Sequence, residues 1–278
     1  MKNLDIILLV LLSISLSSCT RYYYCPNTIN APLLAEKNDV HLAGSMGSSD
    51  QVSILNMQAS YSPINHLGLM GNYASYNASP STPNNTSNTN TNNATAHLLE
   101  AGLGYYYSTQ GRVKLVSDIY GGFGGGKMNS DVNMNFHRFF IQPGMGIRSN
   151  HFDMIFNVRV CNIKYYNFDA NGQSEDYLLS QNLIDNNGKR IDNGTYTFFE
   201  PSITIRAGFR FVKFQFQLVG VNSSGYIPWN YESSVFSTGL CFIIEDMIEL
   251  GKEKAEGGKY NVKFPLGMTS LSAISNFL

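Results

Sequence analysis

The chain has 278 residues, enough for one large domain or two small ones, and no linker-like stretch divides it evenly. Its 19 Lys and Arg against 20 Asp and Glu give a net charge of −1, which excludes the basic excess expected of a protein that binds nucleic acid. Charged residues make up 14%, well below the roughly 25% of a soluble globular protein, whereas Tyr and Phe number 17 each. This composition favours a lipid-facing or extracellular β protein.

The first residues are typical of a secretion signal. Lys2 precedes an apolar run, Ile6–Leu12, that is too short to span a bilayer. The run leads to Leu16-Ser17-Ser18-Cys19, which is similar to a bacterial lipobox, where the Cys thiol is acylated and the preceding peptide is removed. We therefore predict a signal peptide over 1–18 and a lipid on Cys19; the alternative is an ordinary secretion signal with an incidental Cys. The lack of an acidic run after Cys19 favours retention on the periplasmic side.

Residues 19–37 contain two prolines and show no periodicity, which predicts an extended linker after the lipidated Cys. Pro26-Asn27, Asn30-Ala31-Pro32-Leu33 and Glu36-Lys37 together resemble the same region of the small outer-membrane β-barrel lipoproteins of Bacteroidota, a family without a characterised function. Gln58–Tyr61 and His66–Met70 extend the resemblance. It implies an outer-membrane location and a barrel fold, and it transfers no catalytic residue.

Between 38 and 243, apolar and polar residues alternate with period two, the mark of strands with one apolar and one polar face. Thr195–Asn222 is the clearest example, with Phe and Ile on one parity and charged residues on the other. Ten such runs are predicted, most of them long enough to cross an outer membrane: Asn38–Gly47, Val52–Ser62, Leu67–Asn77, Ala96–Tyr107, Arg112–Lys127, Met134–Ser149, Asp153–Tyr166, Tyr196–Arg210, Phe211–Val221 and Ser233–Ile243. The pattern predicts an all-β fold, an antiparallel up-and-down transmembrane barrel over 38–243, followed by a periplasmic tail over 244–278.

The predicted connections alternate in length. Those at 63–66, 108–111, 150–152 and 210–211 are short, whereas 79–95 and 167–195 are long and 222–232 is intermediate. Outer-membrane barrels have short periplasmic turns and long extracellular loops. The long connections are therefore expected outside the cell, and the start of the first strand in the periplasm.

The parity that faces the lumen carries most of the charge. Because an unpaired buried charge is costly, these side chains are expected to neutralise one another in a salt-bridged, largely filled interior. The predicted network comprises Glu100, Lys114, Asp118, Arg138, Arg148, Arg159, Glu200, Arg206 and Arg210. Since the cations outnumber the acids, the alternative is a narrow pore that prefers anions.

Other motifs give weaker signals. Gly121–Lys127 lacks the Ser or Thr and the helix that a phosphate loop requires, so a glycine-rich strand is expected. Neither the His nor the Cys spacing fits a metal site, so no metal or other cofactor is expected. Cys161 and Cys241 share the inward parity; a disulfide is conceivable, but free buried thiols are expected. His97 and His137 are both expected to face outward near the extracellular rim, where an outer-membrane lipid hydrolase could place a Ser-His pair with Ser75 as a conceivable nucleophile.

The sequence therefore predicts an outer-membrane lipoprotein barrel, in contact with outer-membrane lipid, with a structural or surface-interaction role through its extracellular loops. It predicts neither an enzyme nor a nucleic-acid partner, and it names no protein or small-molecule ligand. Two alternatives remain open at this stage: a narrow channel or transporter for small anionic solutes, and a soluble β domain anchored by lipid alone.

Overall fold

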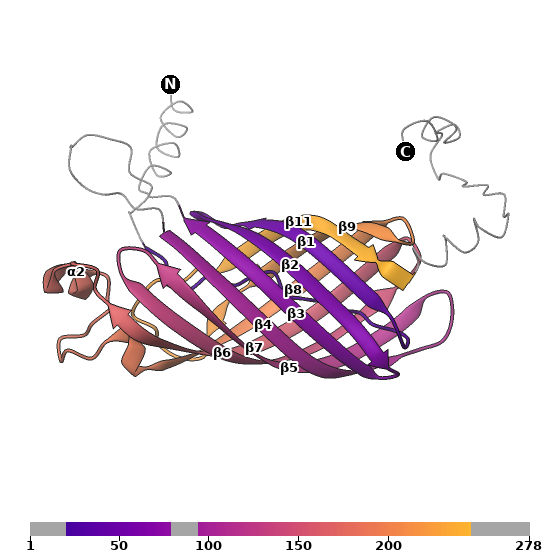
Figure 1. Ribbon diagram of the computed structural model, residues 1–278, viewed down its shortest axis with the longest axis horizontal. Helices are drawn as coiled ribbons and strands as arrows, with labels where there is room; N and C mark the ends of the chain where they lie inside the picture. The colour runs from indigo at the N-terminus through magenta and orange to yellow at the C-terminus, as the bar shows by residue number, and fades with distance from the viewer. Residues whose placement is uncertain (1–20, 79–93, 246–278) are drawn as a thin grey trace, which may run out of the picture.

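The computed structural model describes residues 21–78 and 94–245, and these form a closed antiparallel barrel of ten strands (Figure 1). The predicted fold class is confirmed. Cys19, the signal peptide over 1–18, and the tail from 246 onward lie outside the described residues. The strands are β1 Val40–Ser48, β2 Val52–Ile64, β3 Leu67–Ala78, β4 Ala94–Ser108, β5 Lys114–Asn129, β6 Asn133–Arg148, β7 Phe152–Asp169, β8 Thr195–Gly208, β9 Val212–Gly220, β10 Asn222–Ser223 and β11 Ser234–Ile243.

The barrel closes through pairing of its first and last long strands. Each strand from β1 to β9 pairs with the next, β9 pairs with β11, and β11 returns to β1 with His41 opposite Ile243. The two-residue β10 only extends the edge of β8. Closure leaves no free sheet edge, which is what allows a sheet to cross a bilayer with every ladder hydrogen bond made.

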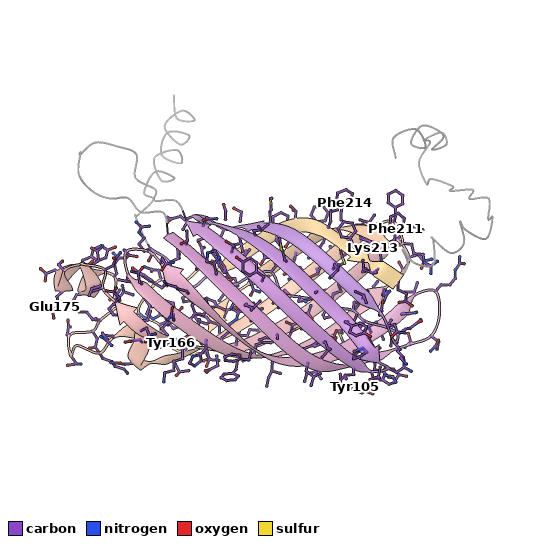
Figure 2. The ribbon with its side chains drawn as sticks, viewed as in Figure 1. Tyr105, Tyr166, Glu175, Phe211, Lys213 and Phe214 are labelled. Atoms are coloured by element: carbon purple, nitrogen blue, oxygen red, sulfur yellow. The ribbon has the colours of Figure 1, made fainter. Side chains whose placement is uncertain are left out.

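The outer surface of the barrel is apolar. Leu99 and Phe214 expose 66% and 62% of their surface, and Phe214 projects away from the wall in Figure 2. Along β2 the buried and exposed positions alternate strictly, with Asn56 and Gln58 facing in and Leu55 and Met57 facing out. An apolar exterior around a polar interior is the arrangement expected for strands that meet lipid. Among the described residues, no helix is long and apolar enough to cross a membrane.

The glycine-rich run lies on β5 and makes room for large side chains in the lumen. A Cβ on Gly122 would come within 2.3 Å of the Phe140 ring, and one on Gly126 within 2.0 Å of the His97 carbonyl oxygen. The run therefore serves packing inside a sheet. It is not followed by a helix, which agrees with the strand predicted there.

The two ends of the barrel differ, and Figure 1 shows them at opposite ends of the long axis. The long-loop end carries the β7–β8 connection with helix α2 (Glu175–Ser180) and the 3-10 turn η1 (Ile191–Asn193), together with the β9–β11 connection. The short-turn end carries the turns at 65–66, 109–113, 149–151 and 209–211. Among the described connections, the long one predicted over 167–195 and the intermediate one over 222–232 lie at the end opposite to the four short turns, whereas residues 79–93 of the long connection predicted over 79–95 lie outside the described residues.

Residues 21–37, which we call the N-terminal plug, run through the lumen from one end to the other. At the long-loop end the Tyr23 amide donates to the Asn230 carbonyl at 2.9 Å, and Tyr24 forms an isolated parallel bridge with Tyr231. Further along, Ile29 and Leu33 are fully buried. The plug reaches the short-turn end before β1 begins. The segment predicted as a linker thus fills the barrel, and Arg21 lies at the end opposite to the predicted periplasmic start.

Candidate functional site

The middle of the lumen holds a chain of buried ion pairs. Arg138 Nε donates to Glu100 at 2.7 Å, and Arg159 Nε donates to Glu200 at 2.5 Å. Arg159 Nη1 also lies 3.8 Å from Glu100, so the two pairs are joined. All four side chains are at most 1% exposed. Such pairs hold together only when their remaining hydrogen-bonding capacity is met, because both charges have left water.

The plug supplies the missing hydrogen bonds. Asn27 accepts from Arg159 Nη2 at 2.8 Å and from Arg138 Nη2, and its amide donates to Glu100 at 3.0 Å. The Tyr24 hydroxyl donates to Glu200, and its ring stacks on Phe198 with the centroids 4.0 Å apart. One asparagine can bridge both ion pairs because its amide carries an acceptor and two donors. The predicted charge network is therefore completed by a segment outside the strands.

Wall side chains bind the backbone of the plug. Gln217 accepts from the Ile29 amide at 2.7 Å and donates to the Ile29 carbonyl at 2.8 Å. Gln142 donates to the Asn30 carbonyl at 2.7 Å, and Arg206 donates to the Ala31 carbonyl at 2.8 Å. An extended chain without a neighbouring strand needs such partners, since buried backbone groups left unpaired are costly. The inward Gln residues thus take the place of a β ladder.

A second charged cluster lies at the short-turn end. Arg148 binds Asp39, Lys114 binds Glu36, and Lys213 Nζ lies 2.6 Å from Asp153. Glu36 lies at the end of the plug, and Asp39 lies between the plug and β1. Glu245 follows the last strand, β11, at this end. Partial burial and the nearby Asp39 carboxylate raise the pKa of Glu245 to about 7. This end of the plug is therefore held by charge, in a polar cavity of about 250 Å³ that opens to solvent.

A third set of contacts holds the plug at the long-loop end. The hydroxyls of Tyr23 and Tyr177 donate to Asp131 at 2.8 and 2.7 Å. Partial burial and this hydrogen bond raise the pKa of Tyr177 to about 12. Because Tyr177 lies on α2, the contact ties the plug to the β7–β8 connection.

Eight of the nine predicted network residues fall into three groups. Glu100, Arg138, Arg159, Glu200 and Arg206 are buried in the lumen. Asp118 is also inside, but within the described residues its Oδ1 accepts no hydrogen bond. Lys114 and Arg148 lie at the rim of the short-turn end, with side chains 24% and 12% exposed.

The placement of Arg210 in the interior was wrong. Strand β8 ends at Gly208, whose φ of +157° starts the turn 209–211, and Arg210 is exposed there. The sequence showed no turn residues other than that glycine, so two strands were expected to meet at Arg210-Phe211. Strand β8 in fact ends two residues before Arg210, at Gly208.

Several functional side chains were missed. These side chains bind residues of the predicted network or their neighbours: Asp39, Asp153, Tyr24 and Asn27. The first two lie near the ends of predicted strands, and the other two lie outside every predicted strand, so strand parity did not point to them. Among the described residues, the buried Arg and Lys side chains are Arg138, Arg159, Arg206 and Lys213, whereas the buried carboxylates are Asp39, Glu100, Asp118, Asp153, Glu200 and Glu232. The excess of cations that suggested an anion-preferring pore is not present there.

The remaining chemistry-bearing residues are separate from this site. Cys25, Cys161 and Cys241 are free, and the described residues contain no group of three metal-ligating side chains. Ser75 and His97 are direct cross-strand partners on the outer face, where His97 Nδ1 lies 3.0 Å from the Tyr73 hydroxyl. No hydrogen bond joins Ser75 to His97 among the described contacts.

Comparison with known proteins finds matches among solved structures. No family model and no curated protein matches the sequence. Among solved structures, LpxR from Salmonella typhimurium matches with a TM-score of 0.36 and 12% identity over 73% of this chain and 99% of that one. OmpT, an outer membrane protein of Vibrio cholerae, matches with a TM-score of 0.29 and 8% identity over 72% of this chain and 63% of that one. Both are outer-membrane β-barrels.

These comparisons contradict the prediction that the chain is not an enzyme, because LpxR is an outer-membrane enzyme, a lipid A deacylase. At this level of similarity the likeness shows the fold alone and assigns no activity to this chain. The closed antiparallel β-barrel is the part of the sequence-based account that the structure bears out.

Proposed function

We propose that this chain is an outer-membrane lipoprotein barrel that its own N-terminal plug keeps closed, and that its long-loop end acts in recognition at the cell surface. The observation that carries the proposal is the plug, which is bound along the lumen through Asn27, Ile29 and Ala31. A lumen filled by an ordered chain leaves no route for solutes. The exposed apolar belt supports embedding in a membrane rather than anchoring of a soluble domain.

The same proposal places the lipid anchor at the long-loop end. Two peptide units, about 7–8 Å at full extension, separate Arg21 from Cys19. Tyr23 and Tyr24 bind the loops of that end. Since long loops of outer-membrane barrels are extracellular, an acyl chain on Cys19 would enter the outer leaflet from the cell surface. This location differs from the periplasmic retention that the sequence favoured.

Labelling with a membrane-impermeant maleimide on intact cells tests this arrangement. The Arg21→Cys and Asn186→Cys chains are expected to be labelled before lysis, because both residues lie at the long-loop end. The Asn150→Cys chain, altered in a turn at the short-turn end, is expected to be labelled only after lysis. The unaltered chain, with Cys161 and Cys241 buried and Cys25 partly so, gives the background.

The possible failures are distinct. Labelling of Asn186→Cys without Arg21→Cys would contradict the path of the plug. Labelling of Asn150→Cys alone on intact cells would reverse the orientation of the barrel. Release of the Cys19→Ala chain from membranes by carbonate would contradict embedding itself.

A further inference from the structure

The lipid-facing surface of the barrel carries very few ionisable side chains, and they gather in one place. On the outward-facing positions of the strands these are His97 on β4, Lys127 on β5, His137 on β6 and Lys164 on β7. Within the described strands, the one carboxylate that faces outward is that of Asp169, the last residue of β7. A charged side chain that faces lipid destabilises a barrel near the bilayer midplane, and this cost falls to nearly zero at the membrane–water interface. We call these four residues the cationic patch.

Strand register makes the patch continuous. His97 lies opposite Lys127, and His137 lies opposite Lys164. Lys127 lies opposite Asn135, two residues from His137 on the same strand. Opposite residues have Cβ atoms roughly 5 Å apart, and diagonal neighbours roughly 7–8 Å apart, within reach of a lysine side chain. Both ammonium groups and both imidazoles can therefore approach one anionic group.

Aromatic side chains surround the patch on the outer face. The His137 ring lies 5.5 Å from the Tyr166 ring and 6.3 Å from the Phe123 ring. Figure 2 shows Tyr166 toward the end that carries α2, and Tyr105 toward the other end. Leu99 and Phe139, both more than half exposed, continue the surface toward the middle of the barrel. The lysine side chains thus lie at the level of the lipid headgroups, and an apolar strip lies below them. A phospholipid-like amphiphile could contact the first with its headgroup and the second with its acyl chains.

The crowding of like charges also favours a bound anion. Lys127 on β5 and Lys164 on β7 both flank β6 with no carboxylate between them, so an anion placed between their ammonium groups relieves their mutual repulsion. The four patch residues occupy four adjacent strands, β4 to β7, and the outward faces of the other described strands carry no Lys, Arg or His.

We propose that the cationic patch binds the phosphate of a membrane lipid headgroup in the leaflet at the long-loop end. The acyl chains would lie along the strip formed by Leu99, Phe123 and Phe139. Lys127 and Lys164 neutralise the phosphate, His97 and His137 donate hydrogen bonds, and Tyr73 holds the His97 ring. The inference rests on the proposed embedding of the barrel in the outer membrane.

Native mass spectrometry of the full chain, purified in mild detergent and titrated with diphosphorylated lipid A, tests the patch. The unaltered chain is expected to retain this lipid, and to retain dephosphorylated lipid A far more weakly. The Lys127→Gln/Lys164→Gln chain is expected to bind the phosphorylated lipid at least ~10-fold more weakly. The matched control, Arg112→Gln/Lys189→Gln, removes two exposed cations away from the patch and is expected to bind like the unaltered chain.

Equal retention by the patch variant and the control would overturn the site. Equal retention of dephosphorylated lipid A would overturn recognition of phosphate, and release of the lipid by excess inorganic phosphate would assign the patch to free phosphate instead. The fluorescence of the buried Trp229 shows whether each variant is folded. Failure of the proposed function is visible separately, as absence of the unaltered chain from the outer-membrane fraction.

Discussion

Replacing Arg159 with Met is expected to lower the free energy of unfolding by about 3–5 kcal/mol, because it leaves the Glu200 carboxylate buried without its cation. Arg159 also joins the two ion pairs and binds Asn27, so the change loosens the plug. Urea unfolding followed by the fluorescence of Trp229, the one tryptophan of the chain, measures the effect.

A second variant separates charge from packing. Adding Glu200→Gln to Arg159→Met removes the stranded charge and is expected to restore part of the lost stability. The control is Arg190→Met, which breaks the pair with Asp192 on the β7–β8 connection; because the Arg190 side chain is 47% exposed, the change is expected to cost less than about 1 kcal/mol. Equal losses for Arg159→Met and Arg190→Met would contradict the central role of the buried network.

Removing the plug is expected to open the barrel. A chain that begins at Glu36, behind a secretion signal without a lipobox, should show discrete conductance steps in planar bilayers, whereas the intact chain should show none. The reason is that Gln142, Arg206 and Gln217 would lose their partners in the plug and bind water instead. A Cys25→Ser chain keeps the plug and serves as the silent control.

Two outcomes would count against this expectation. Steps from the intact chain would contradict the closed lumen. Silence of a truncated chain that has assembled, as judged by Trp229 fluorescence, would show that wall side chains alone fill the barrel.

The strands could be predicted from the sequence because their cause is local. Along β2, for example, Leu55 and Met57 face lipid while Asn56 and Gln58 face the lumen, and this alternation is visible in the order of the residues. The pairs Glu100–Arg138 and Arg159–Glu200 could be anticipated for the same reason, since each member lies on the inward parity of a long strand.

The plug could not be predicted, because its cause is not local. Asn27 and Ile29 show no periodicity, and their partners Glu100 and Gln217 lie far away in the chain. Residues near strand ends were misjudged for a related reason: Asp39 precedes β1, and Arg210 follows the glycine that ends β8. At such positions the parity of a strand no longer decides which way a side chain points.

Disulfide trapping tests the path of the plug through the barrel most directly. Thr28 Oγ1 lies 3.3 Å from Ser45 Oγ on β1, and Asn30 Oδ1 lies 3.1 Å from Ser60 Oγ on β2. Cysteine pairs at 28 and 45, and at 30 and 60, are therefore expected to form disulfides during assembly, whereas the exchanged pairs 28 with 60 and 30 with 45 are not. Folded protein in which neither matched pair cross-links, or in which the exchanged pairs cross-link equally well, would contradict a plug held in this register inside the lumen.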